Sequence, residues 1–238
     1  GLNTFTLPNY SKHEEYDQNP INLKFFFTNL RDRLLFVVGG SGAVSGAILR
    51  ILEQIKDREI TILYIRPDIT LLSEKASLRE KVTFNILQEY TRSGVFKNMI
   101  LVSNPQLEQI LGGVSVLDYN ERLNELLCST FHMLNAFEHI PSAMSTFSGL
   151  NEISRLSTIG VVDLEKEQEN LFYPLENTRE KVYYYLINED RLKSDKQILN
   201  KIRDFIKNQP CKVSYIIWPT NYDHDYVYVC AYSSIIQR

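Results

Sequence analysis

The sequence predicts an α/β protein with a parallel sheet in its first part, a long central helix, and a smaller α+β domain with a mixed sheet at its end. Three observations predict this order. The apolar run 34–38 leads through a glycine-rich turn into a helical pattern, which is typical of a β–α–β unit. Residues 118–139 form the longest helical pattern of the chain. After residue 150, apolar alternation indicates strands on both sides of one further helix.

Composition limits the class of protein. The chain has 238 residues, of which 44% are hydrophobic and 23% charged, and its formal net charge is −3. This charge gives no basic field for nucleic-acid binding, and no apolar run approaches the roughly 20 residues that cross a bilayer. Three cysteines without CxxC spacing predict neither a disulfide framework nor a metal site, so we expect a cytoplasmic location.

The first strands follow from the apolar runs. The run 34–38 is continuous, which predicts a strand buried on both faces. After the glycine-rich turn, apolar residues at helical spacing predict a helix within 47–57. Residues 60–65 predict a second strand, which should run parallel to the first because a helix connects them. Residues 98–103 predict a third strand.

The remaining segments before the long helix predict helices and loops. We expect an extended polar arm over 1–20 and a short helix over 21–33. An irregular loop over 69–78 should lead into a helix over 79–92. The segment 104–111 predicts a polar turn that ends in a single helical turn.

The character of the sequence changes at Pro141 and the Ser/Gly-rich stretch after it. We therefore predict a first domain over 1–140, which includes the central helix, and a second domain over 141–238. Neither internal repeats nor low-complexity tracts interrupt the two parts.

The second domain should be an α+β structure. Residues 157–163 and 181–187 predict strands, and residues 194–208 predict a helix. Two last strands, 211–217 and 226–236, are separated by a short polar turn. This arrangement predicts that they pair as an antiparallel hairpin.

A glycine-rich turn, Gly39-Gly40-Ser41-Gly42-Ala43-Val44-Ser45-Gly46, joins the first strand to the next helix. Backbone N–H groups at a helix N-terminus carry partial positive charge, and glycines let a phosphate approach them closely. We therefore predict the phosphate loop of a nucleotide-binding domain, with the candidate residues Gly39, Gly40, Ser41, Gly42, Ser45 and Gly46. The alternative is a tight strand-to-helix turn that binds no ligand.

The glycine spacing narrows the class of nucleotide site. It reads GxGxxxG rather than the dinucleotide fingerprint GxGxxG, and no Lys-Ser or Lys-Thr pair follows, which excludes a Walker A loop. A dinucleotide site stays open, because the second strand ends near Arg66 and Asp68, where a ribose or a 2′-phosphate would be bound.

The order of elements from residue 34 to residue 236 resembles that of the tubulin/FtsZ family. The glycine-rich turn is similar to the family's GGGTGSG phosphate loop, with Ala43-Val44 in place of its Thr-Gly pair. The segment 102–110, VSNPQLEQI, is similar to the family's strand-end motif IDNEALYDI. The resemblance implies a parallel-sheet, tubulin/FtsZ-like GTPase domain, a long central helix and a smaller activation-type domain.

The resemblance also implies contacts to a guanine base and its sugar. Asn104 takes the place of the motif's guanine-binding Asn, and Asn124 lies where the family's central helix offers a second one. An amide both donates and accepts hydrogen bonds, as the edge of guanine requires. Glu74 and Arg79 follow the second strand, where the family contacts the ribose. The alternatives are helix caps or solvated side chains.

A turn after the long helix resembles the family's loop GLINVDFAD, which enters the nucleotide site of the neighbouring subunit in polymers. Gly149 and Asn151 match this inter-subunit loop. The two Asp positions of the family hold Ile153 and Leu156, so Glu152 is the acid that could act in catalysis. The alternative is a helix-start turn with Asn151 as its cap.

The resemblance therefore implies a protein that binds GTP or GDP with Mg²⁺, associates head to tail into filaments, and hydrolyses GTP weakly or not at all. Two alternatives stay open: an NAD(P)-dependent oxidoreductase that uses GGSGAVSG, and a non-catalytic scaffold that keeps the fold. The family's first strand–turn–helix units have no counterpart here, and the chain begins with Gly rather than Met. We expect either a fragment of a longer chain or a divergent member.

Overall fold

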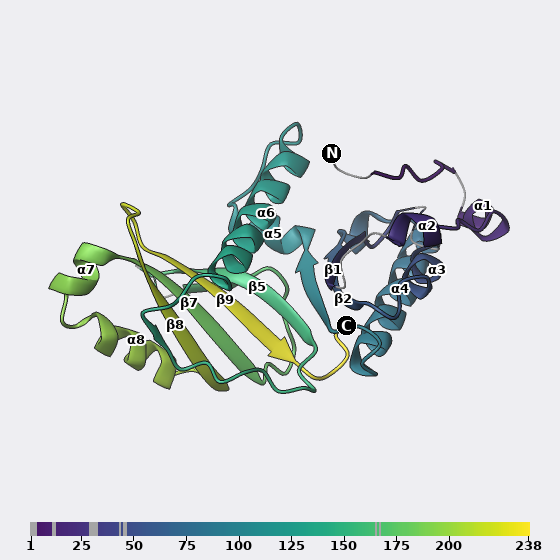
Figure 1. Ribbon diagram of the computed structural model, residues 1–238. Helices are drawn as coiled ribbons and strands as arrows, with labels where there is room; N and C mark the ends of the chain where they lie inside the picture. The colour runs from purple at the N-terminus through teal and green to yellow at the C-terminus, as the bar shows by residue number, and fades with distance from the viewer. Residues whose placement is uncertain are drawn as a thin grey trace. The chain divides into compact units, whose positions relative to one another are not determined.

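The computed structural model forms two compact units, residues 1–100 with 238 and residues 101–237 (Figure 1). The strand β3 (Asn98–Ser103) belongs to the first unit at its start and to the second at its end. The functional domains predicted from the sequence, 1–140 and 141–238, have other boundaries than these two compact units. They stay a prediction. The residues that the structure describes are 4–10, 13–28, 33–42, 44, 47–164, 166 and 168–238.

The first unit places helices around a pair of parallel strands. Its elements before β3 are α1 (His13–Gln18), α2 (Lys24–Phe27), β1 (Arg33–Gly39), α3 (Ile48–Glu53), β2 (Glu59–Arg66), the 3-10 turn η2 (Ile69–Leu71) and α4 (Glu74–Arg92). Strand β1 pairs in parallel with β2 along its whole length, as the sequence predicts. Helix α4 begins five residues earlier than predicted, because Ser73 caps it by accepting a hydrogen bond from the Ala76 N–H.

Strand β1 is not buried on both faces, so that prediction is wrong. Its residues alternate between exposed and covered, and the side chains of Leu35 and Val37 are 44% and 56% exposed. Among the described strands β1 has one neighbour, β2, and occupies an end of the strand order. An end position leaves one long edge and part of a face open even when the sequence is continuously apolar.

Residues 13–18 form a helix, which corrects the prediction of an extended arm over residues 1–20. Helix α1 covers His13–Gln18, and Tyr16 is buried. The Tyr16 hydroxyl donates to the Pro8 carbonyl oxygen at 2.8 Å. Tyr16, Leu23, Ala47 and Ile51 form one apolar cluster, so α1 and the segment before α2 pack on α3.

The second unit is a mixed sheet with helices on both faces. Its elements after β3 are α5 (Asn104–Ile110), α6 (Tyr119–Phe137), β4 (Met144–Ser145), β5 (Leu156–Asp163), β6 (Gln168–Leu171), β7 (Glu180–Asn188), α7 (Glu189–Ser194), α8 (Ile198–Lys207), β8 (Lys212–Thr220) and β9 (Tyr226–Ser233). The short strands β4 and β6 were not predicted. The predicted helix over 194–208 corresponds to α8, which begins four residues later, and the short helix α7 before it was not predicted.

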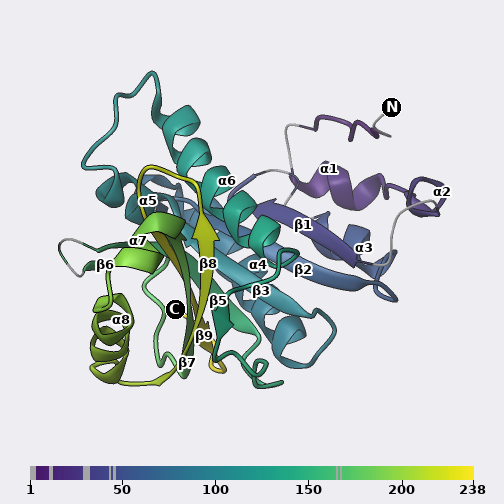
Figure 2. The same cartoon turned by 60° about the vertical axis from the view of Figure 1, so that its left-hand side comes forward.

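The strands of this unit run in the order β5-β9-β7-β8-β4, and β6 pairs separately with β5. Strand β7 is parallel to β8 and antiparallel to β9, so the sheet is mixed, as predicted. Tyr183 and Tyr185 pack against α8 on one face. On the other face, Tyr184 stacks on Trp218, which also contacts Phe137 of α6. Figure 2 shows α8 and α6 on opposite sides of these strands.

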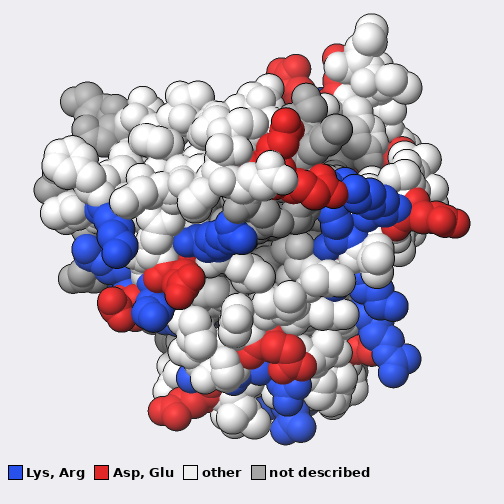
Figure 3. Space-filling model, turned by 90° about the vertical axis from the view of Figure 1, so that its right-hand side faces the viewer, with Lys and Arg blue, Asp and Glu red and all other residues white. Residues whose placement is uncertain are grey.

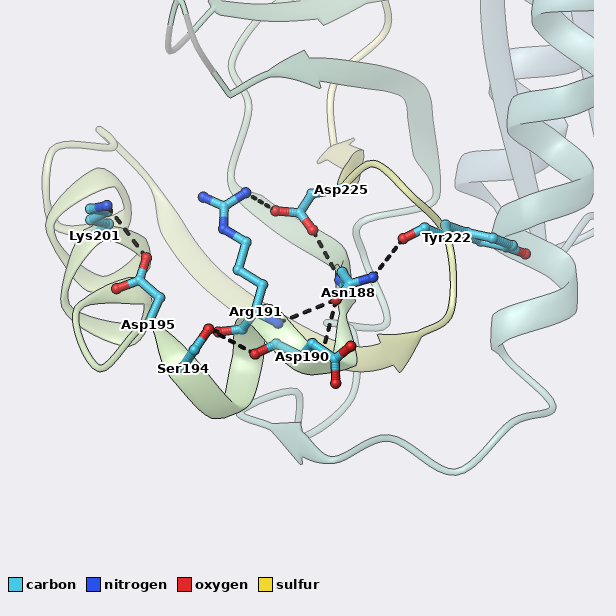
Figure 4. A network of polar contacts seen from close by, with 8 residues as sticks. All are labelled: Asn188, Asp190, Arg191, Ser194, Asp195, Lys201, Tyr222 and Asp225. Carbon is cyan, nitrogen blue, oxygen red and sulfur yellow. Dashed lines mark hydrogen bonds and ion pairs between the residues drawn. The ribbon is translucent and has the colours of Figure 1, made fainter.

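The prediction of a hairpin between the last two strands is wrong. Strand β7 lies between β8 and β9, so the polar turn that joins them must pass the end of β7. Asn188, at that end, donates from its backbone N–H to Asp225 at 2.9 Å and from its side chain to the Tyr222 carbonyl at 2.9 Å. Asp225 also pairs with Arg191 of α7 (Figure 4). These contacts hold the turn in its crossing position.

Candidate functional site

The glycine-rich turn begins where β1 ends. The Gly40 N–H donates to the Ile65 carbonyl oxygen at 3.0 Å, and a side-chain carbon on Gly40 would lie 2.5 Å from the Tyr64 hydroxyl oxygen. Gly39 has open space within 4 Å of the same position. Packing therefore requires glycine at position 40 but not at position 39. At position 39, a small residue would allow a ligand to approach the backbone closely.

The rest of the predicted phosphate loop is described only in part. Ser41 and Gly42 continue the turn, with Ser41 partly covered and Gly42 exposed. Val44 packs against the apolar cluster around Tyr16 and Ile51. The other predicted positions, Ser45 and Gly46, lie outside the described residues, as does Ala43.

A buried polar network that was not predicted from the sequence lies behind Gly40. Glu80 of α4 is 1% exposed, and its Oε1 accepts from the Tyr64 hydroxyl at 3.2 Å and from Arg66 Nε at 3.1 Å. The Arg66 guanidinium lies 4.5 Å from the centre of the Phe84 ring. A charged residue on the apolar stripe of a helix, beside Phe84 and Leu87, was the signal that could have revealed this network.

The two predicted sugar-side residues occupy different environments on α4. Glu74 is the first residue of the helix and is exposed to solvent. Arg79 is partly covered, and its Nε is buried without a hydrogen-bond partner in the described part of the chain. A buried N–H donor without a hydrogen-bond partner is energetically costly. Arg79 is therefore a better candidate than Glu74 for contact with an anionic ligand.

The two predicted guanine-binding asparagines belong to the second unit. Asn104 is the first residue of α5 and is partly covered, but it is not the cap, which is Ser103. Asn124 is exposed on α6, outside the buried stripe of that helix. Within the described residues, neither side-chain amide has a hydrogen-bond partner. Both amides are therefore available to a ligand.

The turn that contains Gly149, Asn151 and Glu152 is exposed and tied to β7. Gly149 has a φ of +107°, which favours glycine. The Asn151 N–H donates to Glu180 Oε1 at 3.3 Å, and Glu180 pairs with Lys212 at 3.2 Å. Asn151 Oδ1 accepts from the Ile153 N–H at 3.2 Å.

No helix starts at this turn, so the alternative of a helix-start turn capped by Asn151 is wrong. The Asn151 side chain instead closes a short turn, and the chain continues into β5 at Leu156. The Glu152 side chain is exposed. An exposed carboxylate on a turn anchored through Glu180 is accessible to a second molecule.

The surface charges and the metal-ligating side chains say little more about which ligand the protein binds. On the face drawn in Figure 3, positive and negative side chains are interspersed among uncharged surface. Within the described residues, no group of three or more His, Cys, Asp and Glu side chains is placed to hold a metal ion. Of the helices that can be described, none is both long and apolar enough to cross a membrane.

The sequence matches no protein-family model and no curated protein. The fold, however, matches solved structures. A GTPγS-form protofilament of Bacillus thuringiensis serovar israelensis TubZ is 18% identical, with a TM-score of 0.62 over 90% of this chain and 64% of that one. CetZ from Methanosaeta thermophila strain DSM 6194 is 16% identical, with a TM-score of 0.58 over 94% and 67%.

An empty FtsZ dimer from M. jannaschii is 12% identical to this chain, with a TM-score of 0.62 over 93% of this chain and 68% of that one. At such low identity the likeness establishes only the fold, which this chain shares with the TubZ, CetZ and FtsZ structures. The present chain spans about two thirds of the length of these structures.

Proposed function

From the fold that it shares with TubZ, CetZ and FtsZ structures, we propose that this chain is the larger part of a guanine-nucleotide-binding protein that assembles into filaments in the cytoplasm. The observation that carries the proposal is the structural match over 90% of the chain to TubZ in a GTPγS-form protofilament. The TubZ chain is longer, so activity and partners of the whole protein are part of the proposal.

The proposed phosphate contact is the turn after β1. Gly39 leaves open space at the end of the strand, and the backbone N–H groups of such a turn bind anions well. Arg79 offers a buried donor without a partner among the described residues, and it would add positive charge for a phosphate or a sugar contact. GTP or GDP with Mg²⁺ is the proposed ligand.

The proposed guanine contacts are Asn104 and Asn124. Both amides lack a partner within the described residues, and an amide matches the mixed donors and acceptors of guanine. Weak or absent hydrolysis follows from the turn over residues 149–152, because Glu152 is its acid and stands one position away from the family's catalytic place. The same exposed turn is the proposed contact to the next subunit in a head-to-tail filament.

Nucleotide titration tests this function against the alternatives. GTP and GDP should bind, and NADP(H) should not; Asn104→Ala or Asn124→Ala should weaken GTP binding about tenfold, since each removes hydrogen bonds to the base. Asn135→Ala, also on α6 and exposed, is the matched control and should bind as the wild type does. Binding of NADP(H) instead of GTP would favour the oxidoreductase, and binding of neither would favour the scaffold.

Assembly is tested separately by pelleting and light scattering with GTP, GDP and no nucleotide. We expect nucleotide-dependent assembly and a slow release of phosphate, which Glu152→Gln should lower further. Glu138 is also exposed, so Glu138→Gln is the matched control and should leave phosphate release unchanged. Assembly without any response to nucleotide would contradict the proposal.

A further inference from the structure

The first residues of the glycine-rich turn lie directly against strand β2. The Gly40 N–H donates to the Ile65 carbonyl oxygen at 3.0 Å, just after the last residue of β1 that pairs with β2. A side-chain carbon at position 40 would lie 2.5 Å from the Tyr64 hydroxyl oxygen and 3.0 Å from Pro67 Cδ. The Tyr64 hydroxyl therefore occupies the space beside the Gly40 backbone and limits where that backbone can lie.

The hydroxyl of Tyr64 is itself held in one place. Tyr64 is fully buried, and its ring packs against that of Phe84, with 5.1 Å between the ring centres. The hydroxyl donates to Glu80 Oε1 at 3.2 Å. Since a phenol has a single proton to donate, this bond fixes the direction of the O–H group.

The carboxylate of Glu80 is a fixed acceptor. Glu80 is 1% exposed, and Arg66 Nε donates to the same oxygen, Oε1, at 3.1 Å. The Arg66 guanidinium lies 4.5 Å from the centre of the Phe84 ring, and its Nη1 donates to the backbone oxygen of Arg238 at 2.7 Å. An unpaired charge away from water is costly, so the buried carboxylate is held to the position of its cationic partner.

The next two backbone N–H groups of the turn belong to Ser41 and Gly42. In the described part of the chain, neither N–H donates a hydrogen bond. Gly42 is exposed, and a side-chain carbon at Gly39 would meet nothing within 4 Å, so this side of the turn is open. Successive N–H groups of a turn are suited to bind an anion. Their direction follows from the position of Gly40, which precedes them in the chain.

We propose that Tyr64 and Glu80 are positioning residues for the phosphate of the bound nucleotide. They fix the Gly40 backbone from β2 and α4, and so direct the N–H groups of Ser41 and Gly42 at the phosphate. Both side chains are buried and act through the turn, without contact with the ligand. The inference rests on the proposed guanine-nucleotide function. It adds that phosphate binding depends on a buried side-chain network and not on the glycines alone.

Nucleotide titration of Tyr64→Phe tests the proposal. The variant keeps the ring beside Phe84 and leaves Glu80 paired with Arg66, but it loses the hydroxyl beside Gly40. GTP and GDP should bind about tenfold more weakly than to the wild type. Guanosine, which carries no phosphate, should bind equally well to both. Tyr90→Phe, which changes an exposed tyrosine of α4, is the matched control and should bind all three ligands as the wild type does.

A double-mutant cycle connects the network to the turn. In Gly40→Ala the new carbon meets the Tyr64 hydroxyl at 2.5 Å, whereas in the Tyr64→Phe background the nearest of the remaining atoms are at 3.0 Å. Gly40→Ala should therefore weaken GTP binding about tenfold in the wild type and about threefold in Tyr64→Phe. Gly39→Ala, where nothing lies within 4 Å, should have the same effect in both backgrounds. Melting curves by circular dichroism check that each variant is folded at the assay temperature.

The outcomes separate this inference from the proposed function. Equal binding of GTP to the wild type and to Tyr64→Phe would overturn the positioning role. An equal loss for GTP and guanosine would also overturn it, because the defect would then not concern the phosphate. Equal effects of Gly40→Ala in both backgrounds would show that the hydroxyl does not act through residue 40. A wild type that binds no GTP would overturn the proposed function, and this inference with it.

Discussion

Strands β1 and β7 each contain a continuous apolar run, but they are buried to very different extents. In β1 every second side chain is exposed, including Leu35 and Val37. In β7 the first eight residues are all buried. An apolar run therefore establishes that a strand forms, whereas its place in the sheet decides how much of it is covered.

The neighbours of the two strands explain this difference. Strand β7 lies between β8 and β9, and α8 and α6 cover its two faces. Strand β1 has the single described neighbour β2. We therefore expect substitutions around β7 to cost more stability than substitutions around β1, except where β1 ends against Tyr64.

Trp218→Ala should have the largest effect on stability. Trp218 is buried, stacks on Tyr184, contacts Phe137, and donates from Nε1 to the Ile140 carbonyl at 2.9 Å. Its loss leaves a cavity beside β7 and should cost about 3–5 kcal/mol of unfolding free energy. Urea denaturation followed by circular dichroism measures this cost, and a value within 1 kcal/mol of zero would contradict the packing described.

Gly40→Ala should be the exception among changes near β1. Its new carbon would lie 2.5 Å from the Tyr64 hydroxyl, so we expect a cost of about 1–3 kcal/mol. Gly39→Ala is the matched control and should be nearly neutral for stability, because nothing lies within 4 Å. Thermal unfolding of both variants makes the comparison, and equal shifts in Tm would refute the close contact.

Asn188→Ala should cost less, about 1 kcal/mol, because it removes the cap of α7 and the bond to the Tyr222 carbonyl. The fluorescence of Trp218, the single tryptophan of the chain, reports this change within the same unit. Asn221→Ala, in the same exposed turn, is the control and should leave the unfolding midpoint unchanged.

The smallest effect should occur near pH 9, where an alkaline loss of stability begins. Burial raises the pKa of the Cys230 thiol to about 12, from an ordinary value of 9.0. The folded state binds this proton more tightly than the unfolded state, so stability is complete below about pH 9 and is lost as the pH rises towards 12. Near pH 9 the loss should be about 0.4 kcal/mol, and at pH 10 it should reach about 1.4 kcal/mol. In Cys230→Ser this part of the pH dependence should disappear from urea denaturation curves; an unchanged curve would contradict it.

From the sequence, the predicted nucleotide site could be identified only as separate segments of the chain. The strand, the glycine-rich turn and α3 follow from local patterns, and so do α6 and its exposed Asn124. The side-chain contacts that hold these segments in place could not be predicted from the sequence. Glu80 contacts Tyr64 and Arg66, which are 16 and 14 positions away in the chain, and Glu180 contacts Asn151, which is 29 positions away. Side-chain periodicity carries no information on such contacts.

The sequence by itself determined the kinds and order of most elements, because helix and strand periods are local properties of the chain. It also determined that a glycine-rich turn ends the first strand. Only the tertiary structure decided which strands are neighbours, since pairing depends on contacts between distant segments. That is why β7 separates β8 from β9, why β1 is half exposed, and why β6, among the described strands, pairs with β5 alone.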